Sequence, residues 1–167
     1  LSRELEFRVG FLGLRGTGTR SLPFPQYHIR EQAGMFGEND IEEVWNDFAA
    51  GERGVILTVW DITRTAYLAD PSILPDCRLR DFVERRPYQL WGYFPVDSHG
   101  PGGTFQKAFI RPYLGYDRRL FYGKWACDIA ERSLGVRDDW IPHGINLNTW
   151  KMIPRGEGEP STSMPDD

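Results

Sequence analysis

Hydrophobic and polar residues follow one another along this chain in blocks that predict strands alternating with helices. The first apolar block, residues 7–14, predicts a strand, whereas residues 15–25 are polar, rich in Gly and Pro, and fit neither element. Alternation of this kind is typical of a parallel sheet with helices packed on both faces. We therefore predict an α/β protein built on an open parallel sheet.

The clearest helix of the sequence lies just before residue 51. Apolar residues recur there at helical spacing, namely Ile41, Val44, Trp45 and Phe48. Asn39 or Asp40 precedes them as the N-cap, and Gly51 supplies the stop signal. A second helix is predicted over residues 124–134, with Gly135 at its end.

Further apolar blocks predict the remaining strands. Residues 54–60 form a nearly continuous run of β-branched and aromatic residues, which predicts a strand buried on both faces. Residues 90–96, 119–122 and 136–141 are the other strand candidates. These runs contain aromatic residues that could serve as a platform for a sugar, but we expect them in the core: Trp60, Trp91 and Tyr93.

Composition indicates a single domain. With 167 residues, 40% of them hydrophobic, the chain can bury one core of ordinary size. A net charge of −4 and a pI near 5.4 argue against a nucleic-acid binder, which usually carries a basic face. A local basic run has acidic residues interspersed, and it predicts a solvated face: Arg78, Arg80, Arg85 and Arg86.

The cysteines and the apolar segments of the sequence indicate where the protein resides and whether it holds a metal. Cys77 and Cys127 lie far apart, so neither a disulfide framework nor a zinc site is expected. No apolar run reaches the ~18 residues of a membrane span, and no signal peptide is visible, so we expect a cytoplasmic protein. Carboxylates are not clustered, and neither a metal nor another cofactor is expected.

Polar residues follow three of the predicted strands. Asp61 follows the second strand, Asp97 and His99 follow the third, and His143 and Gly144 follow the last. Since ligands of open α/β sheets bind outside the carboxyl ends of the strands, we expect these residues to share one edge of the sheet. The alternative for either aspartate is that it caps the turn or helix after it.

Glycines after the first strand suggest a second type of site. Gly13, Gly16 and Gly18 do not form the dinucleotide fingerprint G-x-G-x-x-G. A loop of this kind is either merely flexible or brings backbone N–H groups close to a phosphate, because glycine lacks the Cβ that would block the approach.

The segment Trp140-Ile-Pro-His-Gly-Ile-Asn-Leu147, closed by Trp150 and Pro154, carries a family resemblance. It resembles the Pro-His-Gly-(Ile/Val)-Asp...Phe-x-Pro element of retaining, family-4-like glycosyltransferases, which consist of two Rossmann-like domains. Asn146 stands where that family commonly has aspartate, and Trp150 replaces its usual phenylalanine.

Two other segments extend the resemblance. Residues 93–97, Tyr-Phe-Pro-Val-Asp, resemble the strand and Pro-(Val/Ile)-Asp of these enzymes, and residues 119–126 resemble their next strand and helix start, with Gly123 in place of the usual serine. The match covers about residues 55–154 well and the N-terminal third loosely. Between Leu14 and Ile41 there is room for little more than one element, where the family has more.

The resemblance implies that residues 1–154 form the N-terminal Rossmann-like half of a GT-B fold and residues 155–167 a linker or disordered tail. The implied reaction is sugar transfer from a nucleotide sugar to a carbohydrate or other hydroxyl acceptor, with retention at the anomeric carbon. This half would supply the acceptor side, and a donor-binding domain, in cis or in trans, would supply the rest. We therefore expect the 167 residues alone to be inactive.

The resemblance also assigns roles to the polar residues at the strand ends and in the glycine loop. Asp97 and His99 would be catalytic, near the reacting centre, and Gly16 and Gly18 would face the donor diphosphate. The acceptor side or the edge of the cleft would be formed by Asp61, His143 and Gly144. The alternative function is a non-catalytic, acceptor-binding or partner-binding Rossmann-like module.

Overall fold

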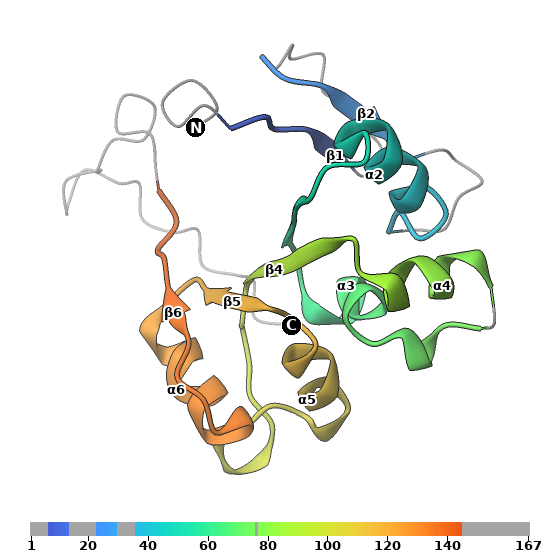
Figure 1. Ribbon diagram of the computed structural model, residues 1–167. Helices are drawn as coiled ribbons and strands as arrows, with labels where there is room; N and C mark the ends of the chain where they lie inside the picture. The colour runs from blue at the N-terminus through green and yellow to red at the C-terminus, as the bar shows by residue number, and fades with distance from the viewer. Residues whose placement is uncertain (1–6, 14–22, 30–35, 76, 145–167) are drawn as a thin grey trace, which may run out of the picture.

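The computed structural model of this chain describes residues 7–13, 23–29, 36–75 and 77–144. Strands and helices alternate along most of that length (Figure 1). In chain order, the elements are β1 (Phe11–Gly13), β2 (Gln26–His28), α2 (Ile41–Ala49), β3 (Gly54–Val59), α3 (Ile62–Ala69), the 3-10 turn η1 (Pro71–Ile73), α4 (Arg78–Arg85), β4 (Tyr88–Phe94), the 3-10 turn η2 (Pro101–Gly103), α5 (Lys107–Leu114), β5 (Arg118–Phe121), α6 (Lys124–Leu134) and β6 (Asp139–Trp140).

The main sheet has four strands in the order β3-β4-β5-β6, and every neighbouring pair is parallel. The register places Leu57 beside Trp91, Trp91 beside Arg118, and Leu120 beside Asp139. Helices connect the successive strands, as parallel pairing requires. The predicted fold class is confirmed: the chain is an α/β protein with a Rossmann-like open parallel sheet.

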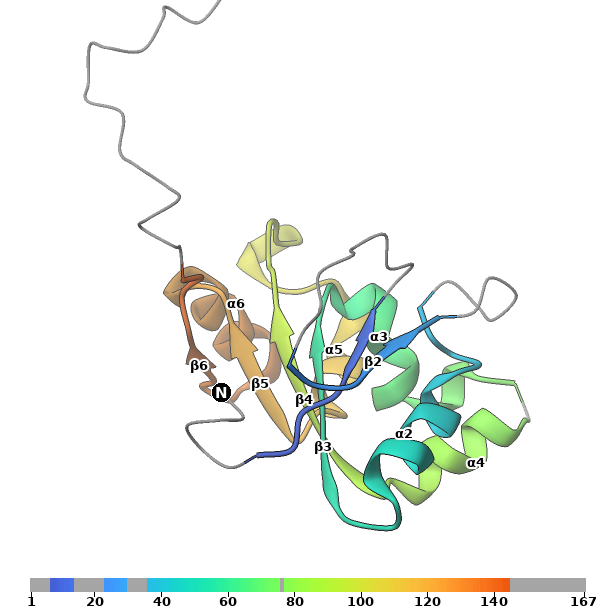
Figure 2. The same ribbon diagram turned by 90° about the horizontal axis from the view of Figure 1, so that it is seen from above.

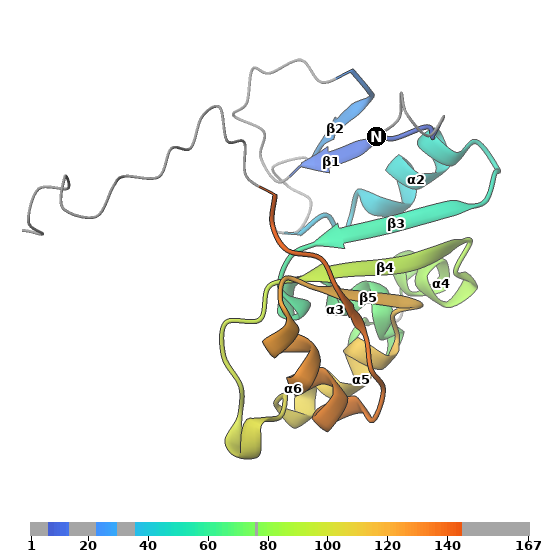
Figure 3. The ribbon, with the colours of Figure 1, turned by 90° about the vertical axis from the view of Figure 1, so that its left-hand side faces the viewer.

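A second, two-stranded parallel sheet is formed by β1 and β2. It lies beyond the β3 side of the main sheet, close to α2 (Figures 2 and 3). The Tyr27 hydroxyl donates to the Asp47 carboxylate of α2 at 2.7 Å, and the Arg8 guanidinium lies 5.0 Å from the centre of the Phe48 ring. Helix α2 therefore attaches the small sheet to the rest of the domain.

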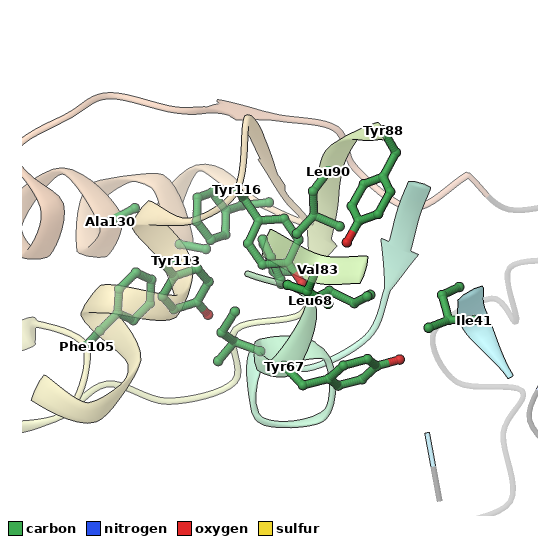
Figure 4. Packing of buried hydrophobic residues seen from close by; sticks show 14 of the residues in the cluster. Ile41, Tyr67, Leu68, Val83, Tyr88, Leu90, Phe105, Tyr113, Tyr116 and Ala130 are labelled. Atoms are coloured by element: carbon green, nitrogen blue, oxygen red, sulfur yellow. The ribbon is translucent and has the colours of Figure 1, made fainter. Parts of the chain in front are cut away.

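The core lies between one face of the main sheet and its helices (Figure 4). Alternate residues of β4 point into it, and Leu90 and Phe94 are fully buried. Phe94 makes edge contacts with Tyr113 of α5 and with Tyr116, at centroid distances of 5.0 and 4.9 Å. Gly115 lies where α5 meets α3, and a Cβ there would overlap the Ala69 carbonyl, so glycine is needed for this close approach.

A buried ion pair joins β5 to the segment before β6. Arg119 donates from Nε and Nη2 to the two carboxylate oxygens of Asp138 at 2.8 and 2.9 Å. Its Nη1 donates to the carbonyl oxygens of Tyr113 and Tyr116. Both charged side chains are nearly buried, with exposed fractions of 13% and 10%. Arg119 therefore ties α5, β5 and the approach to β6 together.

The strongest sequence predictions are confirmed. Helix α2 begins at Ile41 after Asp40 and ends where Ala50 and Gly51 adopt positive φ, and α6 covers the predicted residues 124–134. The first and last strands are shorter than predicted, because only Phe11–Gly13 and Asp139–Trp140 pair with a neighbour. Strand β2 and helices α3, α4 and α5 were not predicted.

The prediction that β3 is buried on both faces is wrong for the part of the chain that the structure describes. Residues of β3 that point away from the core are 41–53% exposed, and the described helices pack against the other face. We call this side of the sheet the uncovered face. It includes Val55, Leu57 and Val59 of β3, Gln89, Trp91 and Tyr93 of β4, and Leu120 of β5.

Candidate functional site

The carboxyl ends of the main strands bring polar residues to one edge of the sheet, which we call the rim. Asp61 follows β3, Asp97 follows β4, Tyr122 follows β5 and His143 follows β6. Because all four strands are parallel and adjacent, their ends lie on the same side of the sheet (Figure 3). The predicted sharing of one edge by Asp61, Asp97 and His143 agrees with this topology.

Three aromatic side chains form a compact group at the rim, the rim cluster of Tyr93, Tyr122 and His143. The His143 ring packs edge-on against Tyr122 at 3.8 Å between centroids, and Tyr122 lies 4.2 Å from Tyr93. The Tyr93 hydroxyl donates to the carbonyl oxygen of Ile141 at 2.7 Å. This bond spans from β4 to the chain leaving β6 and fixes the backbone two residues before His143.

Both strand-end aspartates affect the pKa of Tyr122, a member of the rim cluster. Burial is the main cause that raises the pKa of the Tyr122 phenol, and the nearby Tyr93, Asp61 and Asp97 raise it further. Asp61 likewise adds to the raised pKa of Tyr113, whose main cause is again burial. The two carboxylates therefore lie near enough to the tyrosine hydroxyls to repel a phenolate, and the Tyr122 hydroxyl stays protonated at neutral pH.

The structure bears on the capping role considered for the two aspartates. Asp61 occupies the N-cap position of α3, but its side chain makes no capping hydrogen bond, and its backbone carbonyl accepts from Arg64 instead. Asp97 precedes no helix directly, since the next helical turn, η2, has Gly100 as its N-cap. Both carboxylates are exposed, so they are available to a ligand.

The remaining predicted residues are placed less centrally. Nδ1 of His99 lies 2.8 Å from the carbonyl oxygen of Gly100, and its ring lies 5.9 Å from that of Trp125 at the start of α6. None of these contacts is with the rim cluster. Gly144 is exposed at the end of the described chain. Gly16 and Gly18 lie outside the described residues, so their predicted phosphate contact stays a prediction.

Sequence reasoning missed the position of two tyrosines at the rim. The sequence predicts Tyr93 in the core and Tyr122 only as part of a strand, whereas the structure has both half-buried at the rim. The expectation that Trp60 and Trp91 belong to the core is also wrong, because Trp60 is 43% exposed and Trp91 lies on the uncovered face. An available signal was the position of Tyr122 directly after β5, next to the strand-end aspartates.

The site offers groups suited to a hydroxylated ligand. Carboxylates accept hydrogen bonds from hydroxyls, a tyrosine or histidine donates or accepts, and aromatic faces contact apolar ring surfaces. Within residues 7–13, 23–29, 36–75 and 77–144, no group of three or more His, Cys, Asp or Glu side chains is arranged to hold a metal ion. Over the same ranges, no helix is both long and apolar enough to span a membrane.

No protein-family model, no curated protein and no solved structure matches this chain. Its function is therefore inferred from the rim and from the residue patterns described above.

Replacing Tyr122 with leucine is expected to release the His143 ring from its aromatic contact. In the parent chain the ring current of Tyr122 should shift the His143 carbon-bound proton resonances away from their random-coil values, and Y122L should move them back towards those values. The chain has three histidines, so H143Q identifies the signal in a proton–carbon NMR spectrum. Y122F keeps the ring and is the matched control. Unshifted His143 resonances in the parent chain would contradict the packing described here.

Proposed function

We propose that this domain is the acceptor-side half of a retaining glycosyltransferase that uses a nucleotide sugar. The observation that carries the proposal is the meeting of Asp61, Asp97, Tyr122 and His143 at the carboxyl edge of a Rossmann-like sheet. Ligands of open α/β sheets bind at this edge. The resemblance of the segments around residues 93–97, 119–126 and 140–154 gives the reaction class.

The exposed carboxylates would bind the acceptor in this proposal. An Asp61 or Asp97 carboxylate accepts a hydrogen bond from an acceptor hydroxyl, which orients that oxygen towards the anomeric carbon. The faces of Tyr122 and His143 would pack against the carbohydrate ring. Negative charge develops on the departing nucleoside diphosphate. The transfer reaction therefore requires positive groups and oriented N–H donors around the diphosphate more than it requires a strong base. A donor-binding domain, in cis or in trans, would provide most of them.

The proposed roles of the other predicted residues follow from their places. His99, on the loop after β4, would approach the reacting centre together with Asp97 when the donor-binding domain is present. Gly16 and Gly18 would contact the donor diphosphate through backbone N–H groups. The proposal includes a cytoplasmic location, which the two free thiols of Cys77 and Cys127 support.

A donor panel tests this function on the full-length natural protein. We expect it to release nucleoside diphosphate from one of the common UDP-, GDP-, ADP- or dTDP-sugars, and to do so faster when the acceptor is present. D61N should lower transfer at least about tenfold, because it removes a charged acceptor for a substrate hydrogen bond. D81N, on α4 and away from the rim, is the matched control and should leave transfer unchanged (Figure 3).

The negative outcome is equally clear. If the full-length protein consumes no donor and binds none in the millimolar range, the glycosyltransferase proposal is wrong. Transfer by residues 1–167 alone would show instead that the donor site lies within this chain.

One observation favours a second candidate, a non-catalytic partner-binding module. The uncovered face is a largely apolar surface that extends from the rim along the strands, and its Leu57 and Val59 are each 53% exposed. A chain that binds partners through this face and consumes no donor would fit the module and not the enzyme.

A further inference from the structure

The uncovered face has a charge pattern as well as an apolar centre. Arg118 of β5 lies on it, because its guanidinium is 5.5 Å from the centre of the Trp91 ring and the two residues are neighbours in register. Arg53 stands two residues before Val55 and shares its side of the chain by strand alternation. Among the described residues, no carboxylate lies within 4.0 Å of either guanidinium.

Negative charge lies at the other end of the same surface. Asp139 of β6 is exposed on this surface beside Leu120, and Asp61 and Asp97 lie at the adjoining rim, after the carboxyl ends of β3 and β4. The face is therefore positive where the strands begin, apolar at its centre and negative where the strands end. A bound segment must match this order of charges along the strand direction.

We propose that the uncovered face binds an amphipathic α-helix of a partner protein, with acidic residues at the end of that helix next to Arg53 and Arg118. Parallel sheets of α/β proteins are normally covered on both faces, and large exposed apolar surfaces mark interaction sites. Among the described residues, the helices pack on the opposite face. This inference does not rest on the proposed sugar transfer, but the amino end of the bound helix would lie beside Asp61 and Asp97, which the proposed function assigns to the acceptor.

The dimensions suit one short helix. The six residues of β3 span ~20 Å at ~3.3 Å per residue, which matches about 13 helical residues at ~1.5 Å each. Four strands spaced ~4.8 Å apart are about 14 Å wide, enough for one helix of ~10 Å diameter. The dipole of the partner helix favours the same orientation. Its partly negative carboxyl end would lie next to the two arginines, and its partly positive amino end would lie next to the aspartates.

Two synthetic peptides test the proposal with the 167-residue chain. Each is a 14-residue helix with a leucine stripe, one with two glutamates in its last turn and one with two lysines there. We expect the glutamate peptide to bind at least about tenfold more tightly and to shift the NMR signals of the Leu57 methyls and the Trp91 indole. R118E should reverse the preference between the peptides, and L57S should weaken binding at least about tenfold.

Controls separate the face from general charge effects. R137E changes an exposed arginine on the segment after α6 and should leave the peptide preference intact. Circular dichroism of L57S and R118E should match the parent chain, because both side chains are exposed.

Several results would overturn the proposal. Equal affinity for both peptides would contradict recognition of the acidic helix end by the two arginines. NMR shifts confined to other surfaces would contradict binding at the uncovered face. Protection of Leu57 and Trp91 from solvent in the free chain would show that the face is already covered. Self-association that L57S abolishes would assign the face to a second copy, and binding to phosphatidylserine vesicles in preference to the glutamate peptide would assign it to a membrane surface.

Discussion

Replacing Asp138 with asparagine is expected to lower the free energy of unfolding by about 3 kcal/mol. The substitution removes the charge that balances Arg119, and the asparagine amide group would face an N–H of the guanidinium where a carboxylate oxygen now accepts. Leaving a charge buried without its partner is costly, whereas the net value of an intact buried pair is small. Urea unfolding followed by circular dichroism measures the change.

An exposed ion pair close by in sequence serves as the control for the buried pair of Arg119 and Asp138. Arg137 and Glu131 are separated by 3.5 Å and are 67% and 48% exposed. E131Q should lower the free energy of unfolding by less than about 0.5 kcal/mol, because solvent screens this ion pair. If D138N costs no more than E131Q, then the Arg119 charge is not buried in solution and the path of the chain between α6 and β6 differs from the one described here.

Alkaline pH is expected to unfold this domain steeply above pH 10. The pKa values of Tyr67, Tyr88, Tyr113 and Tyr116 are raised above 10, in each case mainly by burial. A raised folded-state pKa means that the unfolded chain loses the proton first, so stability is complete below pH 10 and is lost as the pH rises. Each such group that stays protonated in the folded chain contributes about 1.4 kcal/mol per pH unit, so four together contribute about 5.5 kcal/mol per pH unit.

The expected consequence is unfolding near pH 11 to 12, since a domain of this size has a total stability of about 5–15 kcal/mol. Urea midpoints at pH 9, 10 and 11, with phenolate absorbance near 295 nm, measure it. Y88F is the informative variant, because the Tyr88 hydroxyl is buried without a hydrogen-bond partner among the described residues. It should be neutral or slightly stabilising at pH 7 and should reduce the alkaline slope by about a quarter. A slope unchanged by Y88F would contradict the assignment.

Y116F is the contrasting variant at neutral pH. The Tyr116 hydroxyl donates to Thr65 at 2.7 Å and lies 3.3 Å from the Thr58 hydroxyl, within the core. Removal of this hydroxyl should lower the free energy of unfolding by about 1–2 kcal/mol at pH 7, because the two threonine hydroxyls lose a hydrogen-bond partner. The pair of tyrosine variants thus separates the hydrogen-bonded phenol from the unbonded one.

The sequence was sufficient for the elements with strong local signals. Helix α6 runs from Lys124 to Leu134 and is followed by Gly135 at φ +72°, as its end signal predicted. Helix α4 was missed although Leu79, Phe82 and Val83 have helical spacing, because the surrounding arginines were read only as a solvated surface. Helix α5 contains Pro112, which weakens a helix prediction, yet packing of Pro112 and Tyr113 into the core holds it.

The candidate site was predictable in outline and not in detail. Strand-end positions suggested that Asp61, Asp97 and His143 meet, because that follows from parallel topology alone. The rim cluster was not predictable, since the contact of Tyr122 with His143 depends on how the chain turns after β6. The exposure of β3 was also unpredictable, because an apolar run has the same sequence pattern whether its second face is covered by a helix or not.

The shortness of β6 has a consequence for how this protein associates. An exposed sheet edge invites another strand to add to it, but β6 pairs through only two residues, and one of them is the charged Asp139. So short an edge is a poor template for strand addition and for the growth of cross-β fibrils. Of the two edges of the main sheet, the six-residue strand β3 and not β6 is therefore the one long enough to pair with a further strand.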